Sequence, residues 1–161
     1  MRNDDLAALV YENMLLSRVS SSGYRPHRKG ILLDRSAAAL LARLEAQPDM
    51  TVAELSDALG LDISTVHRQL AAAMRQGYIA KRSAPSSSAK VHSATDKGLE
   101  LLHREIEARK KTVDDITHDW EDSELAEFVR LMRKFNEGVE EMRGHPWPRC
   151  DVQGRCSGPR P

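Results

Sequence analysis

The chain has 161 residues, of which 40% are hydrophobic and 4% aromatic, and its 24 basic and 24 acidic side chains give a formal net charge of zero. A zero net charge argues against a protein that coats nucleic acid without sequence preference, and no apolar run approaches the roughly 20 residues that span a bilayer. The N-terminal sequence lacks a secretory pattern. We therefore expect a soluble, cytoplasmic protein of one domain with extensions, whose helical core is built mainly from Ala, Leu, Val and Met.

The charges are unevenly distributed along the chain. Residues 61–98 contain six basic and two acidic side chains, a net charge of +4. Residues 99–143 contain eight basic and thirteen acidic side chains, a net charge of −5. A neutral total is therefore compatible with one basic face on an acidic body, although chance clustering gives similar patches.

The first two predicted helices are separated by a segment that breaks helical structure. Apolar residues recur at helical spacing over residues 4–19, which predicts an amphipathic helix. Residues 20–30 contain serines, a glycine and a proline, which interrupt a helix. Asp34 is a suitable N-cap for a second helix that runs to about Ala46.

A short helix, a turn and another helix follow. Thr51 and Glu54 have the spacing of a capping box at the start of a helix that ends before Gly60. Asp62 can cap the next helix, which runs to about Gln76. Two helices joined by three or four residues are typical of a helix-turn-helix.

A weak strand signal comes next, and two long helices follow it. Residues 78–83 and 90–94 flank Pro85 and three serines, which predicts a two-stranded hairpin. Thr95 can cap the first long helix, and a second one, capped by Asp122 or Ser123, ends at Gly144. Their apolar stripes are Leu99, Leu102, Ile106, Val113 and Ile116, then Leu125, Phe128, Val129, Met132, Phe135, Val139 and Met142.

The helix over residues 63–76 separates polar from apolar residues along its length. Its first half carries hydrogen-bonding side chains, and its second half is rich in alanine. In a DNA-binding helix-turn-helix, the N-terminal residues of the second helix contact base edges in the major groove. We predict that the groove contacts are made by Ser64, Thr65, His67, Arg68 and Gln69, with Arg68 bound to guanine or to a phosphate. The polar outer face of any amphipathic helix looks similar, so this pattern alone leaves both interpretations open.

Residues 31–143 resemble the MarR family of bacterial winged-helix transcription regulators. The resemblance rests on ILLDRSAAALLARLEAQPDMTVAELSDALGLDISTVHRQLAAAMRQGYIAKR, then TDKGLELL and DWEDSELAEFVRLMRKF, in this order. It implies a fold that is mainly α with a small β-hairpin, in which a winged helix-turn-helix lobe joins a helical dimerisation body. The implied divisions are an N-terminal helix and loop (1–30), a DNA-binding lobe (31–98), dimerisation helices (99–143) and an irregular Pro/Gly-rich tail (144–161).

The family resemblance also implies partners. It implies a homodimer that binds a near-palindromic operator in double-stranded DNA, more often as a repressor. It also implies that a small aromatic or amphipathic effector releases the dimer from DNA. Phosphate contacts are expected from Arg75, Arg82 and Lys90. Loose candidates for effector contacts are Tyr11, Tyr24, His27, Arg109 and Lys110, although an ordinary surface or interface role is the better explanation for each of them.

The predicted hairpin departs from the family pattern. The family usually carries an Asp-Arg pair near the tip of the wing. In this chain the matching positions fall near Ser87 and Ser88, so the pair is absent, and the usual leucine before Thr95 is Ala94. This departure leaves a second hypothesis open, in which the dimeric winged-helix protein binds another protein and has lost DNA binding.

Other chemistries have little support in the sequence. Cys150 and Cys156 lie in the tail beside Arg149 and Arg155, which leaves a thiol-based sensor as a third hypothesis. Together with His145 the two cysteines make an incomplete metal site, so we expect neither a metal nor a cofactor. There is no phosphate-binding loop, nucleophile elbow or helical histidine pair, so we do not expect an enzyme.

Overall fold

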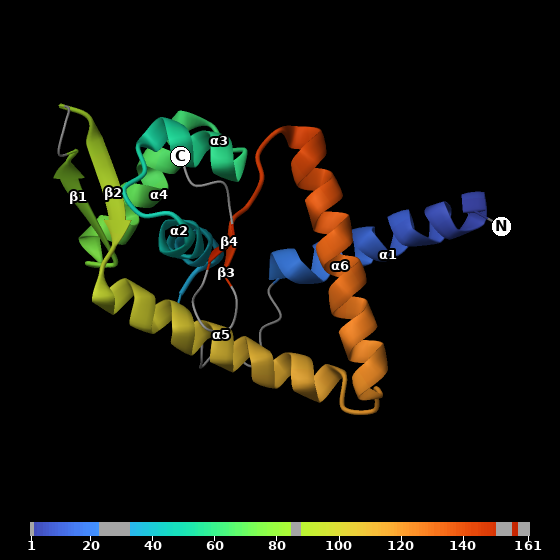
Figure 1. Cartoon of the computed structure of the whole chain (residues 1–161). Helices are drawn as coiled ribbons and strands as arrows, with labels where there is room; N and C mark the ends of the chain where they lie inside the picture. Colours follow the sequence, from blue (N-terminus) through green and yellow to red (C-terminus); the bar gives the residue numbers. More distant parts are fainter. Residues whose placement is uncertain (1, 23–32, 85–87, 151–155, 158–161) are drawn as a thin grey trace.

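The computed structural model describes residues 2–22, 33–84, 88–150 and 156–157. Six helices and two small antiparallel sheets are arranged as a lobe with a wing, from which a long helical arm extends (Figure 1). In chain order the elements are α1 (Arg2–Ser22), α2 (Arg35–Ala46), α3 (Val52–Leu59), α4 (Ile63–Arg75), β1 (Ile79–Ser83), β2 (Lys90–Ala94), α5 (Asp96–Ile116), α6 (Asp122–Arg143), β3 (Arg149–Cys150) and β4 (Cys156–Ser157). The prediction of a mainly α fold with a small hairpin is confirmed.

Local hydrogen bonds fix the start of three helices as predicted. The Asp34 carboxylate accepts from the backbone N–H of Ala37, 2.9 Å away, at the start of α2. Thr51 and Glu54 form both halves of the capping box of α3. The Thr95 hydroxyl accepts from the backbone of α5 in the same way. Each cap satisfies N–H groups that have no partner within the helix.

Two helix starts differ from the prediction. Asp62 occupies the N-cap position of α4, but its side chain accepts no capping hydrogen bond. Helix α6 begins after Glu121, which with Glu124 forms a capping box, and not after Asp122 or Ser123. A carboxylate at N3 that reaches back to the N-cap backbone explains this shift by one residue.

Helix α2 lies at the centre of the lobe and packs against α3, α4, α5 and β2. Its apolar face is completely buried, and neighbouring elements contribute the rest of one core. The buried hydrophobic residues of this core are Leu33, Ala37, Leu40, Leu41, Leu44, Met50, Leu55, Val66, Leu70, Ala73, Ile79 and Leu102. Burial of each large aliphatic side chain contributes about 1.5–3 kcal/mol, so this cluster supplies most of the stability of the lobe.

The wing is a two-stranded hairpin that one further β-bridge ties to the segment before α3. Strands β1 and β2 pair antiparallel, with Ile79 opposite Ala94. On the other side of β2, Met50 and His92 exchange two backbone hydrogen bonds of 3.1 and 2.8 Å. The segment before α3 therefore fixes the base of the wing to the core.

Helices α5 and α6 form an arm that leaves the lobe and returns toward it (Figure 1). Trp120, in the turn between them, contacts Phe128 edge to face, with ring centroids 5.4 Å apart. The described residues leave much of the apolar surface of the arm and of α1 uncovered. Its large exposed side chains are Leu6, Leu9, Val10, Tyr11, Met14 and Leu15 on α1, Ile106, Val113 and Ile116 on α5, and Leu125, Phe128, Val129, Leu131, Phe135 and Met142 on α6.

The segment after α6 returns to the lobe and contacts α2. The guanidinium of Arg43 lies 5.6 Å from the centroid of the Trp147 ring. Glu140 of α6 accepts from the backbone N–H of Trp147, at 3.0 Å, and from Arg149, at 2.9 Å. Within the tail, Cys150 of β3 lies directly opposite Cys156 of β4 in backbone register.

The helices of the described part of the chain are all too short or too polar to cross a membrane.

Gly98 in α5 allows the start of this helix to touch the wing. A Cβ atom at this position would lie 2.3 Å from the backbone oxygen of Tyr78 and 2.8 Å from Leu41. We expect Gly98→Ala to lower the free energy of unfolding by about 1–3 kcal/mol in urea denaturation, because overpacking displaces backbone. Gly138→Ala, where the new Cβ meets nothing within 4 Å, is the control and should leave stability unchanged or raise it by about 0.5–1 kcal/mol. Equal stability of the Gly98 variant and the wild type would contradict this packing.

Candidate nucleic-acid interface

The burial pattern of α4 sets the direction of its polar residues. Val66, Leu70 and Ala73, spaced at four and three residues, form one stripe that is buried against the core. On the opposite side, His67 and Arg68 are exposed. An amphipathic helix whose apolar stripe is buried has no freedom to rotate, so the N-terminal half of α4 presents these polar side chains to solvent.

The predicted groove residues differ in their exposure. Ser64 is exposed like His67 and Arg68, whereas Thr65 and Gln69 are half-buried at the two edges of the polar face. All five come from the first seven residues of α4, so the structure brings them together on one end of a single helix.

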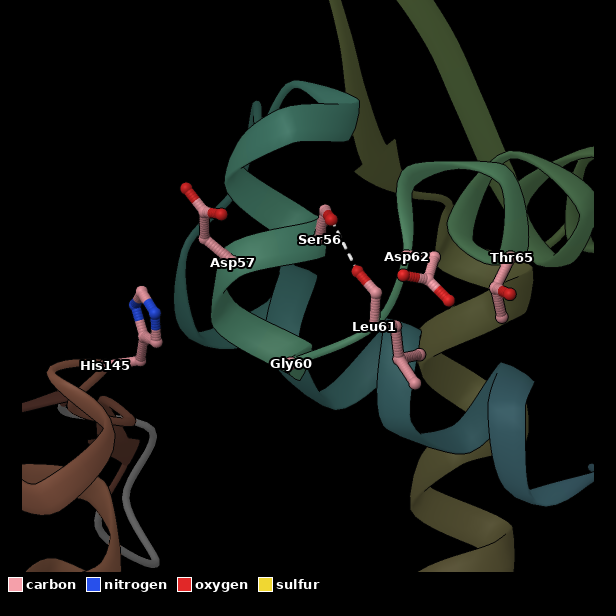
Figure 2. Close-up of a pocket in the computed structure, with 7 residues that line it drawn as sticks. All are labelled: Ser56, Asp57, Gly60, Leu61, Asp62, Thr65 and His145. Carbon is pink, nitrogen blue, oxygen red and sulfur yellow. Dashed lines mark hydrogen bonds between the residues drawn. The ribbon is translucent and has the colours of Figure 1, made fainter.

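The turn before α4 is held by its own hydrogen bonds. The Ser56 hydroxyl donates to the backbone oxygen of Leu61 (Figure 2). Gly60 ends α3 with a φ of 62°, in the left-handed region that favours glycine. These contacts fix the angle at which α3 supports α4.

A polar cleft of about 360 Å³ lies beside this turn (Figure 2). Residues of α3, of the turn and of the start of α4 line one side, and His145, from the segment after α6, faces them. The lining residues are Ser56, Asp57, Gly60, Leu61, Asp62, Thr65 and His145. The cleft therefore joins the predicted groove-binding end of α4 to the C-terminal arm.

The predicted effector contacts lie elsewhere. Tyr11 is exposed on α1, and Arg109 and Lys110 are exposed on α5, where they pair with glutamates one turn earlier. Tyr24 and His27 lie outside the described residues. None of the three described candidates lines the cleft.

The predicted phosphate contacts lie on α4 and on the two strands of the wing. Arg75 is exposed in the last turn of α4. Lys90, at the start of β2, donates from its ammonium group to the Ser83 hydroxyl of β1 at 2.7 Å. Arg82 of β1 is exposed and forms a two-pronged ion pair with Asp49. The tip of the wing, residues 85–87, lies outside the described residues.

Sequence reasoning missed the role of Asp49. Its carboxylate accepts from Arg82 of β1 and from the Ser93 hydroxyl of β2, so it joins the two strands of the wing. These hydrogen bonds, that of Ser93 first, lower the pKa of Asp49 below its usual value. The residue adopts a φ of 63°, which few residues other than Gly, Asn and Asp tolerate. The Pro-Asp turn after α2 indicated an irregular backbone here, but the sequence gives no sign of partners 33 and 44 residues away.

A buried histidine lies on β2 of the wing, beside Met50. His92 is 2% exposed, and its Nδ1 lies 3.3 Å from the backbone oxygen of Met50, to which it donates. Burial lowers the pKa of His92, the nearby positive charges of Lys81 and His67 lower it further, and the Met50 hydrogen bond opposes both. The folded protein therefore favours the neutral ring.

Among the described residues, no three His, Cys, Asp or Glu side chains are placed to hold a metal ion.

Comparisons with known proteins assign the class. The sequence model of the IclR helix-turn-helix domain matches residues 33–83, from the start of the lobe to the end of β1. The HTH-type transcriptional regulator YxaD of Bacillus subtilis (strain 168) is 30% identical over 105 residues, which are 65% of this chain and 73% of YxaD.

Solved structures show the same fold. A crystal structure of MarR has a TM-score of 0.71 at 24% identity and covers 82% of this chain and 92% of its own. A MarR family protein from Bacillus stearothermophilus has a TM-score of 0.66 at 23% identity, over 83% and 96% of the two chains. PcaV of Streptomyces coelicolor, solved in complex with its natural ligand, has a TM-score of 0.60 at 21% identity, over 80% and 93%.

The fold and the exposed helix define a winged helix-turn-helix protein, and the similarity to YxaD assigns it to the transcription regulators. The chain belongs to the HTH-type transcriptional regulators and has the fold of the MarR family, which confirms the resemblance seen in its sequence.

The buried His92 predicts a pH dependence of stability. Because its pKa is lowered on folding, its contribution is fully present above about pH 6.5, the unfolded value. It declines as the pH falls from there toward the lower folded pKa, since the unfolded state binds the proton first. Urea denaturation at pH 7.5 and 5.5 should show a larger loss for the wild type than for His92→Gln, which has no titrating ring. Equal losses would show that His92 titrates normally.

Proposed function

We propose that the protein is a homodimeric transcription repressor that binds a near-palindromic operator through the N-terminal half of α4. Ser64, Thr65, His67, Arg68 and Gln69 contact the major groove, and Arg75, Arg82 and Lys90 contact phosphates. The observation that carries the proposal is the outward direction of the polar end of α4, next to an exposed wing.

The uncovered apolar surfaces support the dimer. Phe128 and Val129 of α6 are 47% and 53% exposed, and comparable side chains continue along α1 and α5. Exposed large apolar side chains in this number are typical of a protein that buries them in an interface. A second copy supplies the same faces, and its symmetry presents two copies of α4 to successive major grooves about 34 Å apart.

The cleft beside α4 supports control by an effector. It lies between the α3–α4 turn and the segment after α6, so a molecule bound there touches both the lobe and the arm. A ligand shifts a conformational equilibrium only when it binds the two conformations with different affinity. A ligand in a cleft between the lobe and the arm can meet this condition, because a movement of α4 relative to the arm changes the shape of the cleft. PcaV, which shares the fold, was solved with its natural ligand.

The groove assignment is tested by Arg68→Ala. Loss of a two-pronged base or phosphate contact should weaken binding to a duplex selected from genomic DNA by about 1–3 kcal/mol, measured by gel shift, while the dimer persists. The matched control is Arg104→Ala, which removes the same charge from an exposed position on α5 and should bind as the wild type does. Tight, selective binding by the Arg68 variant would remove this residue from the interface. A wild type that selects no DNA would instead favour a protein-interaction module.

The dimer is tested by Phe128→Glu. A charge placed in the apolar face should convert particles of two chains into single chains, as measured by analytical ultracentrifugation, because a buried unpaired carboxylate opposes association. Ala53→Glu adds the same charge to an exposed position on α3 and should leave the mass unchanged. A Phe128 variant that sediments with the wild-type mass would place the interface elsewhere.

A further inference from the structure

The Asp49 carboxylate accepts hydrogen bonds from three donor groups of the wing, two on Arg82 and one on Ser93. Its Oδ1 accepts from the Nε of Arg82 at 3.0 Å and from the Ser93 hydroxyl, while its Oδ2 accepts from the Nη2 of Arg82. The partners come from both strands, and the neighbouring Met50 bonds the backbone of β2. Asp49 is therefore fixed relative to the wing on several sides.

The geometry leaves one edge of the Arg82 guanidinium available. A guanidinium has two edges that can each bind two oxygen atoms. The carboxylate occupies the edge formed by Nε and Nη2. The remaining edge, formed by Nη1 and Nη2, belongs to a side chain that is 57% exposed.

We propose that Asp49 is a positioning residue for DNA recognition, which holds Arg82 so that its outer edge meets a backbone phosphate of the bound duplex. The inference rests on the proposed function, because it needs DNA on the face shared by α4 and the wing. It assigns to Asp49 a favourable effect on DNA binding, although its negative charge alone would weaken binding. A carboxylate near DNA repels phosphates, whereas a carboxylate that orients an arginine improves the binding of one phosphate.

The backbone of Asp49 supports a specific role. Its φ of 63° costs free energy for most residues, and Gly or Asn would adopt it more easily. The Asp49 carboxylate makes the contacts with Arg82 and Ser93 that Gly would lack. Asn tolerates the same backbone and is a neutral acceptor, which makes Asp49→Asn a mild test and Asp49→Gly a second variant free of backbone strain.

The experiment measures binding of full-length protein to a fluorescent duplex that the wild type has selected from genomic DNA, and to a scrambled duplex, over a range of salt. Asp49→Asn and Asp49→Gly should raise Kd for the selected duplex about tenfold, as expected for one lost charge-assisted contact. The salt slope should fall by about one unit. Binding to the scrambled duplex should weaken in parallel, because a phosphate contact is made whatever the base sequence.

A double-mutant cycle separates positioning from a general loss of structure. In an Arg82→Ala background, Asp49→Asn should have no further effect on the Kd for the selected duplex. Ser93→Ala, which removes the other partner of Asp49, should change Kd by less than about threefold, whereas a merely structural role would make it resemble Asp49→Asn. Circular dichroism of each variant verifies the fold.

Three results would overturn the proposal, and they are distinguishable. In the first, both Asp49 variants bind the selected duplex at least as tightly as the wild type does, while Arg82→Ala binds it more weakly. This result would show that Asp49 only repels DNA. Unchanged binding by Arg82→Ala removes the phosphate contact itself, although Arg68 can still carry the proposed function. A wild type that selects no duplex removes the proposed function together with the inference.

Discussion

The structure depends on the burial of one face of α2. Leu40, Leu41 and Leu44 are at most 1% exposed, and α3, α4, α5 and the wing all pack around them. Because α4 must contribute Val66 and Leu70 to the same core, its opposite face has to point outward. The hydrophobic effect thus fixes the direction of Arg68 without any interaction made by Arg68 itself. Recognition residues on this surface can vary while the core holds their geometry constant.

The lobe and the arm differ in how they bury their apolar side chains. The lobe closes its own core within residues 33–102 and uses caps and a bridged wing to hold α4. The arm carries long apolar stripes that the described part of the chain leaves open. The proposed function assigns DNA recognition to the lobe and dimerisation to the arm. The contact of Trp147 with Arg43 and the cleft beside His145 link the two, so a change in the arm has a route to α4.

Local chemistry explains why most of the fold was predictable. Caps at Asp34, Thr51 and Thr95 and the glycine after α3 act within a few residues, and the amphipathic stripe of α4 identifies its buried side. The pairing of Asp49 with Arg82 was not predictable, since it spans 33 residues and depends on how the wing folds back over the α2–α3 segment. The burial of His92 was missed because the strand signal of residues 90–94 is weak and its contact with Met50 spans 42 residues.

The central claim is that paired copies present two outward α4 helices to one face of a duplex. Hydroxyl-radical footprinting of the selected DNA tests it most directly. Two such helices should protect two segments whose centres are about 10–10.5 base pairs apart and related by the dyad of the site. A single protected segment, or two segments on opposite faces of the duplex, would contradict it.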